Sequence, residues 1–308
     1  MSRVDPLVSV VVPVYDEVTT LQETLRSILA QTYDEFEVIL VDDGSTDASP
    51  SVARAVADQH ECVRVLENGT NVGQSFTRNR GAIAANGKYV VFHDADDLST
   101  PDRLAKQVAF MEANPAVGVV GSAYYYDNPL RDERTVRVRP QDDATLRRNL
   151  ARESMVNLGT AMYRWSALTE TSLFRADHIE GYDLLIRIAA DHEIANLSDP
   201  LYVYRVSENS MSRQDELAKK LTLIRRGAQS VRTLGVGHLQ FCLAPGWLAY
   251  MYAPDRVKAV VRRLFSPTDN RPFSADDERR LERTLAIARG DEQATDADET
   301  DPLQSMQD

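Results

Sequence analysis

Aspartates follow two of the strand-like segments of this chain. Asp42 and Asp43 come directly after an apolar run at 36–41, and the run at 89–92 is followed by His93-Asp94-Ala95-Asp96-Asp97. Ligands of an open α/β sheet bind beyond the carboxyl ends of its strands, so we expect these five carboxylates at two adjacent strand ends. Carboxylates this close repel one another unless a cation neutralises them, and oxygen-only ligands favour Mg²⁺ or Mn²⁺. The pattern therefore predicts a divalent-cation site.

The spacing of these aspartates indicates what else the site holds. Residues two apart at a strand end project to the same side, so Asp94 and Asp96 can share one ligand. A metal held by only one or two carboxylates keeps positions open for phosphate oxygens, which suits a diphosphate leaving group. The turn after residues 8–14 has no glycine-rich stretch, which excludes a G-x-G-x-x-G dinucleotide site there. A nucleotidyltransferase that makes an activated sugar would need a glycine-rich, lysine-containing loop at the same place, and none is present.

Alternating strand and helix patterns must position these residues. Apolar runs at 8–14, 36–41, 63–66, 89–92 and 117–122 alternate with helical patterns near 21–29, 48–59 and 75–85. This order is typical of a doubly wound parallel sheet. Beyond it we expect strands at 135–139 and 156–163, a helix at 182–190 and helical structure from about residue 217. Thr20 and Glu23 predict a capping box at the start of the first helix. The fold class is therefore α/β, a mostly parallel sheet flanked by helices, with a small C-terminal helical extension.

The charge balance restricts the partners and the surroundings of the protein. The net charge is −12, and only 5 of the 35 basic residues are lysines. An acidic chain without a basic stripe argues against nucleic acid as a partner. The same composition is typical of proteins built for high salt, although acidity can also simply keep a protein soluble. Two cysteines far apart in the sequence predict neither a disulfide nor a zinc site. Without a signal-peptide pattern or an apolar run of ~20 residues, we expect a cytoplasmic protein.

One block of sequence resembles a known family. The stretch VSVVVPVYDE, followed by LRSILAQTYDEFEVILVDDGSTD and NVGQSFTRNRGAIAANGKYVVFHDADD, is similar to the family 2, GT-A-fold glycosyltransferases. The likeness covers about 8–103 closely and continues more weakly to about 212. It implies a nucleotide-sugar donor, with the base near Tyr15 and one of the Asp42-Asp43 pair, and Arg205 in a late basic loop that closes over the diphosphate. It also implies a metal at Asp94, Asp96 and Asp97. The donor-binding set is then Pro13, Tyr15, Glu17, Asp42, Asp43, Asn71, Gly73, Arg78, Asp94, Ala95 and Arg205.

The resemblance also implies an inverting reaction, in which a carboxylate base deprotonates the acceptor hydroxyl. Family members carry the base as the second residue of a Glu-Asp-x-Asp-Leu stretch, but this chain reads Glu180-Gly181-Tyr182-Asp183-Leu184. A glycine cannot accept a proton. Glu180 is the favoured substitute because a base needs only to reach the hydroxyl, Asp183 is the second candidate, and His178 ranks behind both. The alternative is a non-catalytic nucleotide-sugar-binding or scaffold protein of a glycan pathway.

The resemblance leads to a division of the chain and to an acceptor hypothesis. We expect a glycosyltransferase domain at 1–215, with a nucleotide-binding half (1–120) and an acceptor half (121–215), then a helical extension at 216–288 and an acidic disordered tail at 289–308. The apolar segment 239–252, with basic residues up to 263, is either a pair of core helices or a patch resting on a membrane surface. The second interpretation places the protein at the cytoplasmic face of the membrane. It fits a polyprenyl-phosphate-linked glycan acceptor, as in N-glycosylation or surface polysaccharide assembly.

Overall fold

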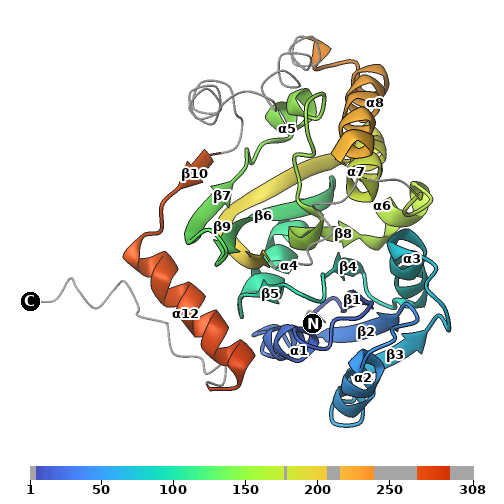
Figure 1. Ribbon diagram of the computed structural model, residues 1–308. Helices are drawn as coiled ribbons and strands as arrows, with labels where there is room; N and C mark the ends of the chain where they lie inside the picture. Colours follow the sequence, from blue (N-terminus) through green and yellow to red (C-terminus); the bar gives the residue numbers. More distant parts are fainter. Residues whose placement is uncertain (1–4, 177–178, 207–215, 239–268, 292–308) are drawn as a thin grey trace, which may run out of the picture.

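Four parallel strands form the first half of a twisted sheet. The structure is a computed structural model that describes residues 5–176, 179–206, 216–238 and 269–291. Strands β1 (Val8–Val14), β2 (Phe36–Asp42), β3 (Val63–Glu67) and β4 (Tyr89–Phe92) lie in the order β4-β1-β2-β3. Helices α1 (Leu21–Leu29), α2 (Ser49–Ala57) and α3 (Gln74–Ala84) connect them (Figure 1). The valines of β1 are at most 1% exposed, which explains the unbroken apolar run, because helices cover both faces of the sheet.

The second half of the sheet is mixed. It contains β5 (Leu98–Ser99), β6 (Val117–Asn128), β7 (Glu133–Val138), β8 (Met162–Arg164) and β9 (Glu193–Arg205). Strand β8 joins the halves by pairing antiparallel with both β4 and β6, and β9 runs parallel to β6. Short β5, which directly follows the Asp94–Asp97 loop, pairs with the end of β9. The end of β9 is thereby fixed beside that loop.

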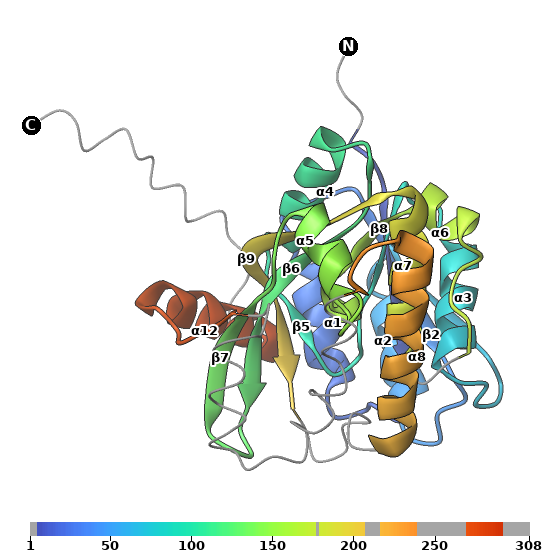
Figure 2. The same ribbon diagram turned by 90° about the horizontal axis from the view of Figure 1, so that it is seen from above.

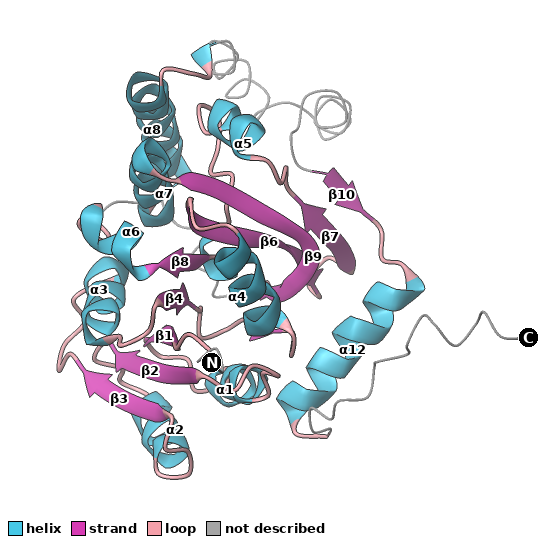
Figure 3. Ribbon diagram, turned by 180° about the vertical axis from the view of Figure 1, so that it is seen from behind, coloured by secondary structure: helices cyan, strands magenta, loops and turns pink. Residues whose placement is uncertain are grey.

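Helices cover both faces of the sheet, with a buried core on each side. One core lies under α3, α5 (Asp143–Asn149), α6 (Trp165–Glu170) and α7 (Glu180–Asp191), and the other under α1, α2 and α4 (Arg103–Ala113). Figure 3 shows the sheet with α4 crossing one face. The predicted α/β class is confirmed.

The C-terminal part of the chain returns to the main sheet. Helix α8 (Glu216–Leu234) runs beside α7 (Figure 2), β10 (Asp269–Arg271) pairs with β7, and α12 (Ala275–Arg289) packs on α1. The predicted extension therefore also contributes a strand. None of the described helices is long and apolar enough to cross a membrane. The predicted membrane segment 239–263 and all but the first residues of the predicted tail lie outside the described residues.

Two local expectations differ from the structure. Residues 158–160 form a 3₁₀ turn, so only Met162 and Tyr163 of the predicted strand 156–163 pair in the sheet, as part of β8. The predicted capping box at Thr20 is absent: the Thr20 hydroxyl donates to Glu17 at 3.0 Å, and Glu23 forms an ion pair with Arg205 instead. A neighbouring residue binds the Thr20 hydroxyl and a distant one binds the Glu23 carboxylate, so neither side chain caps the helix.

Candidate functional site

The two aspartate groups lie on either side of β1. Strand β1 pairs with both β2 and β4, so it separates the two strand ends that carry the aspartates. The expectation from the sequence that these strand ends are adjacent is wrong. The turn after β1 fills the place between them. Tyr15 there is 43% exposed. Asp16 has a φ of 53°, and its Oδ1 accepts from the Thr46 nitrogen at 2.7 Å. The site therefore spans three neighbouring strand ends.

Asp42 and Asp43 organise the loops beside this turn. Asp43 accepts from the backbone nitrogens of Val72 and Gly73, both at 2.9 Å, and so holds the loop that enters α3. Asp42 Oδ2 accepts from the Gly44 nitrogen at 3.1 Å. Its other oxygen, Oδ1, is buried and has no hydrogen-bond partner among the described residues. Asp42 thus keeps one acceptor atom that no described residue uses.

The Asp94–Asp97 loop contains two kinds of carboxylate. The Asp94 side chain is 34% exposed, and the pKa of Asp96 is raised to about 7 by burial and by the negative charges of Asp94 and Glu17. Asp97 is 1% exposed, and its oxygens accept from the Tyr202 hydroxyl and the Arg205 nitrogen, both at 2.8 Å. Burial holds the pKa of Asp97 well above its usual range. Both oxygens of Asp97 therefore bind β9, whereas Asp94 and Asp96 remain near the opening.

Arg78 joins three segments that are far apart in the sequence. Its Nη2 lies 3.0 Å from Asp94 Oδ1, and its Nη1 lies 2.9 Å from Glu180 Oε2. The Arg78 side chain is 5% exposed and its guanidinium lies over the Phe174 ring, 6.0 Å from the centroid. Helix α3, the loop after β4 and the first turn of α7 therefore meet at one cation. Three predicted site residues are in direct contact here.

The other candidate base lies away from this cluster. The Asp183 side chain is fully buried, and its oxygens accept from Arg187 at 2.9 Å and from Arg226 at 2.6 Å. Both of its oxygens already bind arginines in the core, so this carboxylate is not placed to meet an acceptor hydroxyl. A Cβ added at Gly181 would lie 3.2 Å from the Leu158 Cβ. His178 lies outside the described residues.

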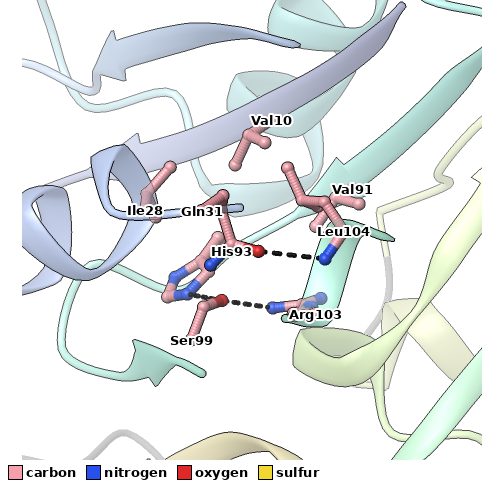
Figure 4. A pocket seen from close by; sticks show the side chains of 8 residues that line it. All are labelled: Val10, Ile28, Gln31, Val91, His93, Ser99, Arg103 and Leu104. Carbon is pink, nitrogen blue, oxygen red and sulfur yellow. Dashed lines mark hydrogen bonds between the residues drawn. The ribbon is translucent and has the colours of Figure 1, made fainter. Parts of the chain in front are cut away.

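A buried polar layer supports the Asp94–Asp97 loop from behind (Figure 4). Arg103, which is fully buried, donates to Ser99 Oγ at 3.0 Å, and Ser99 Oγ lies 3.0 Å from His93 Nε2. His93 Nδ1 lies 2.8 Å from the Asp94 carbonyl oxygen, so it carries the proton and donates to it. Burial and the charge of Arg103 lower the pKa of His93 to about 3, so the ring is neutral. The side chains that line this space leave no room for a water molecule, so the layer is a support and not a ligand pocket.

Several of these supporting residues were not predicted. Ser99, Arg103 and Tyr202 carry no motif, although an arginine at the start of a helix directly after an aspartate loop could have been noticed. The remaining predicted residues lie around the opening: Pro13 in β1, Asn71 exposed in the loop before α3, Gly73 at the α3 N-cap with a φ of 93°, and Ala95 at 5% exposure.

Arg205 is the last residue of β9. Its Nε donates to the Asp96 carbonyl at 2.6 Å and its guanidinium pairs with Glu23. Its Nη2 is buried without a partner among the described residues. The loop predicted to carry it extends to residue 212, and residues 207–215 lie outside the described part of the chain.

Comparison with known proteins agrees with this geometry. The model of the family "Glycosyl transferase family 2" matches residues 9–171. The Bacillus subtilis protein EpsE, provisionally named a glycosyltransferase, is 32% identical over 217 residues, which are 68% of this chain and 76% of EpsE. An uncharacterised glycosyltransferase of Haemophilus influenzae is 38% identical over 122 residues, 40% of this chain and 49% of that protein. This chain therefore spans about half of the H. influenzae protein and about three quarters of EpsE.

Solved structures show the same fold. S. aureus TarS (1–349) in complex with UDP-GlcNAc has a TM-score of 0.63 at 20% identity, over 91% of this chain and 80% of that one. The mannosyltransferase PcManGT from Pyrobaculum calidifontis, in complex with GDP-Man and Mn²⁺, has a TM-score of 0.63 at 21% identity, over 94% and 87%. The predicted GT-A fold is thus confirmed. The chain belongs to glycosyl transferase family 2, and its predicted class, a glycosyltransferase, is confirmed with it.

Proposed function

We propose that the protein transfers a sugar from a nucleotide-sugar donor to an acceptor hydroxyl, with inversion at the anomeric carbon and with Glu180 as the base. The observation that carries this proposal is the Arg78 cluster. Arg78 lies 2.9 Å from Glu180 Oε2 and 3.0 Å from Asp94 Oδ1, so a single side chain separates the two carboxylates. The carboxylate proposed to take the acceptor proton therefore lies beside the loop proposed to hold the donor. Asp183, the second candidate, is buried away from this opening.

The donor is proposed to bind across the three strand ends. The exposed Tyr15 ring can stack on the base, and the unused Asp42 Oδ1 can accept one of its N–H groups. The Nη2 group of Arg205 supplies a donor for a phosphate oxygen at the other side of the loop. Both TarS and PcManGT are described with a nucleotide sugar, but with different bases, so the base of the donor is left open.

A divalent cation fits the Asp94–Asp97 loop. Within the described residues, no three His, Cys, Asp or Glu side chains surround a common metal position. Asp94 and Asp96 provide carboxylate oxygens. Burial raises the pKa of Asp96, the charges of Asp94 and Glu17 raise it further, and a cation would offset the repulsion between these carboxylates. Bound Mn²⁺ or Mg²⁺ would neutralise charge on the diphosphate leaving group. We propose Asp96 and Asp94 as its ligands, and we assign Asp97 to the support of the loop.

Donor hydrolysis tests the proposal. Release of UDP or GDP from UDP-GlcNAc, GDP-mannose and further nucleotide sugars is measured with Mn²⁺ or Mg²⁺, at low and at high salt because the chain is acidic and poor in lysine. Glu180→Gln should lower turnover about 100-fold or more while the affinity for the nucleotide is kept. If wild type and Glu180→Gln are equally inert while both bind the nucleotide, the enzymatic proposal fails. NMR of the product anomer tests inversion.

Gly181 supports a second candidate, a non-catalytic nucleotide-sugar-binding protein. The glycine stands where family members place their base, and Glu180 already forms an ion pair with Arg78. Nucleotide-sugar binding with a clear thermal shift but without turnover in any donor and acceptor mixture would favour this candidate over the enzyme. A ligand at about 100 times its dissociation constant should add about 2.7 kcal/mol of stability.

For the acceptor we propose a polyprenyl-phosphate-linked glycan, reached from the cytoplasmic face of the membrane. The support is the apolar composition of 239–252 and the basic residues that follow it, which suit an interfacial contact. Co-flotation of the full chain with anionic lipid vesicles tests this. Recovery in the soluble fraction at every lipid composition would count against it.

A further inference from the structure

A polar stripe runs along the otherwise apolar helix α7. Glu180, Asp183 and Arg187 are three and four residues apart, so they lie on one face. The residues around them, from Tyr182 to Ala189, are mostly buried apolar side chains. Glu180 reaches Arg78 at the site, whereas the other two side chains of the stripe point to partners outside it. The stripe therefore links the site to the structure behind it.

Asp183 is the centre of a buried ionic network between α7 and α8. Its Oδ2 accepts from Arg187 Nε at 2.9 Å, and its Oδ1 accepts from Arg226 Nη1 at 2.6 Å and from Gln229 Nε2 at 3.2 Å. The side chain is fully buried. A buried charge is stable only where hydrogen bonds satisfy it, so rotation or sliding of α8 along α7 would leave Asp183 Oδ1 without the partners it has on α8.

Arg187 extends the network to the loop beside the site. Its Nη2 donates to the Leu173 carbonyl at 2.6 Å and its Nη1 donates to the Thr171 carbonyl. Ser172 and Leu173 have φ values of 64° and 57°, which side chains other than glycine rarely adopt. The arginine bridges the carbonyl groups that bracket this unusual turn. The position of the Arg187 guanidinium thus depends on its ion pair with Asp183.

The turn ends at Phe174, which contacts the site. The Phe174 nitrogen donates to Asn79 Oδ1 at 2.9 Å, and Asn79 Nδ2 donates back to the Phe174 carbonyl at 2.9 Å. The Phe174 ring lies against the Arg78 guanidinium. A continuous chain of contacts therefore leads from Arg226 on α8 through Asp183 and Arg187 to the residue that holds Asp94 and Glu180.

We infer that Asp183 is a positioning residue and that α8, through Arg226, belongs to the machinery that places Glu180 and Arg78. This inference rests on the proposed function. Asp183 does not exchange protons with the substrate: it fixes the first turns of α7 and the turn at 171–173 so that Glu180 stays beside the donor loop. Helix α8 follows the part of the chain that matches the family, which ends at residue 171. Through these contacts it then acts on the transfer step.

The test compares Arg226→Met with Arg226→Lys and with Arg232→Met. Arg232 is an exposed arginine on the same helix and provides the matched control. Nucleotide release from the nucleotide sugar that wild type turns over fastest gives kcat, and titration with UDP or GDP in Mn²⁺ gives Kd. Arg226→Met should lower kcat per folded molecule by about tenfold to 100-fold, because small misplacements of a catalytic group cost that much. Kd should stay within about twofold, Arg226→Lys should recover most of kcat, and Arg232→Met should match wild type.

The outcomes separate the inference from the proposed function. An active wild type with an Arg226→Met variant that is merely less stable, with an unchanged kcat per folded molecule, overturns the inference alone. A parallel fall in kcat for Arg232→Met does the same. A wild type that binds the nucleotide and turns over no donor overturns the proposed function, and the inference with it. If Arg226→Met does not fold, Arg226→Lys and Gln229→Leu, measured in the same way, decide the question.

Discussion

Replacement of Arg78 by methionine should affect stability and turnover together. Methionine keeps most of the aliphatic length of the side chain but removes the guanidinium that contacts Asp94 and Glu180. Hydrogen bonds to charged groups contribute about 1.5–3 kcal/mol each. We count the free energy of the bond to Glu180 in full, because that side chain is 16% exposed. We discount the bond to Asp94, because that side chain is 34% exposed and solvent screens it. The expected loss in the free energy of unfolding is about 3–4 kcal/mol.

For a chain of this size that loss corresponds to a fall in Tm of roughly 6–8 °C, at about 2 °C per kcal/mol. Differential scanning fluorimetry measures this fall in Tm, and nucleotide release reports the accompanying loss of turnover. Arg80→Met is the control, because Arg80 is exposed on the same helix and donates only to the Glu67 carbonyl and Asn68. If both variants lose the same stability and keep the same turnover, Arg78 is not the bridge described here.

Three further changes have defined outcomes. Gly44→Ala should cost more than about 2 kcal/mol in urea unfolding, because φ is +73° and the new Cβ would lie 2.6 Å from the Thr70 backbone; unchanged stability would contradict the close approach. Gly181→Asp should raise donor turnover above that of Gly181→Ala, since only a small shift of Leu158 is needed, and equal rates would show that no base is missing at this position. Because the folded pKa of Asp96 is about 7, above its usual 3.8, metal-free stability should fall as pH rises through this interval, while the apparent Mn²⁺ affinity should rise about tenfold per pH unit up to pH 7. A Mn²⁺-induced change in Tm that is equal at pH 5.5 and pH 8 would refute this assignment.

The strands of the first half could be predicted because buried strands have a recognisable sequence pattern. Both faces of a parallel sheet are covered, so its strands appear as unbroken runs of valine and isoleucine, and the residues after them must lie at one edge. This placed Asp94 and Asp96 correctly after β4. The order of the strands is not encoded locally, however. The expected adjacency of the two aspartate groups was therefore wrong, since β1 lies between them.

The finer roles depended on contacts between distant segments. Strand β9 was not predicted, so nothing indicated that Tyr202 and the Arg205 nitrogen would occupy both oxygens of Asp97. Asp183 has the spacing of a catalytic residue, but the register of α8 against α7 encloses it between two arginines. The contact of Arg78 with Glu180 joins residues 102 positions apart. No local pattern carries such information.

The place of α12 has a consequence for how the chain matures. Leu281 and Leu285 pack with Leu98, Tyr125 and Val203, and Arg26 of α1 binds the carbonyl groups at the end of α12. A ribosome makes these leucines more than 150 residues after Tyr125. Until these leucines are made, α12 cannot cover the side chains of Leu98, Tyr125 and Val203. The first half of the sheet can begin to fold early, but this packing is completed only when α12 emerges.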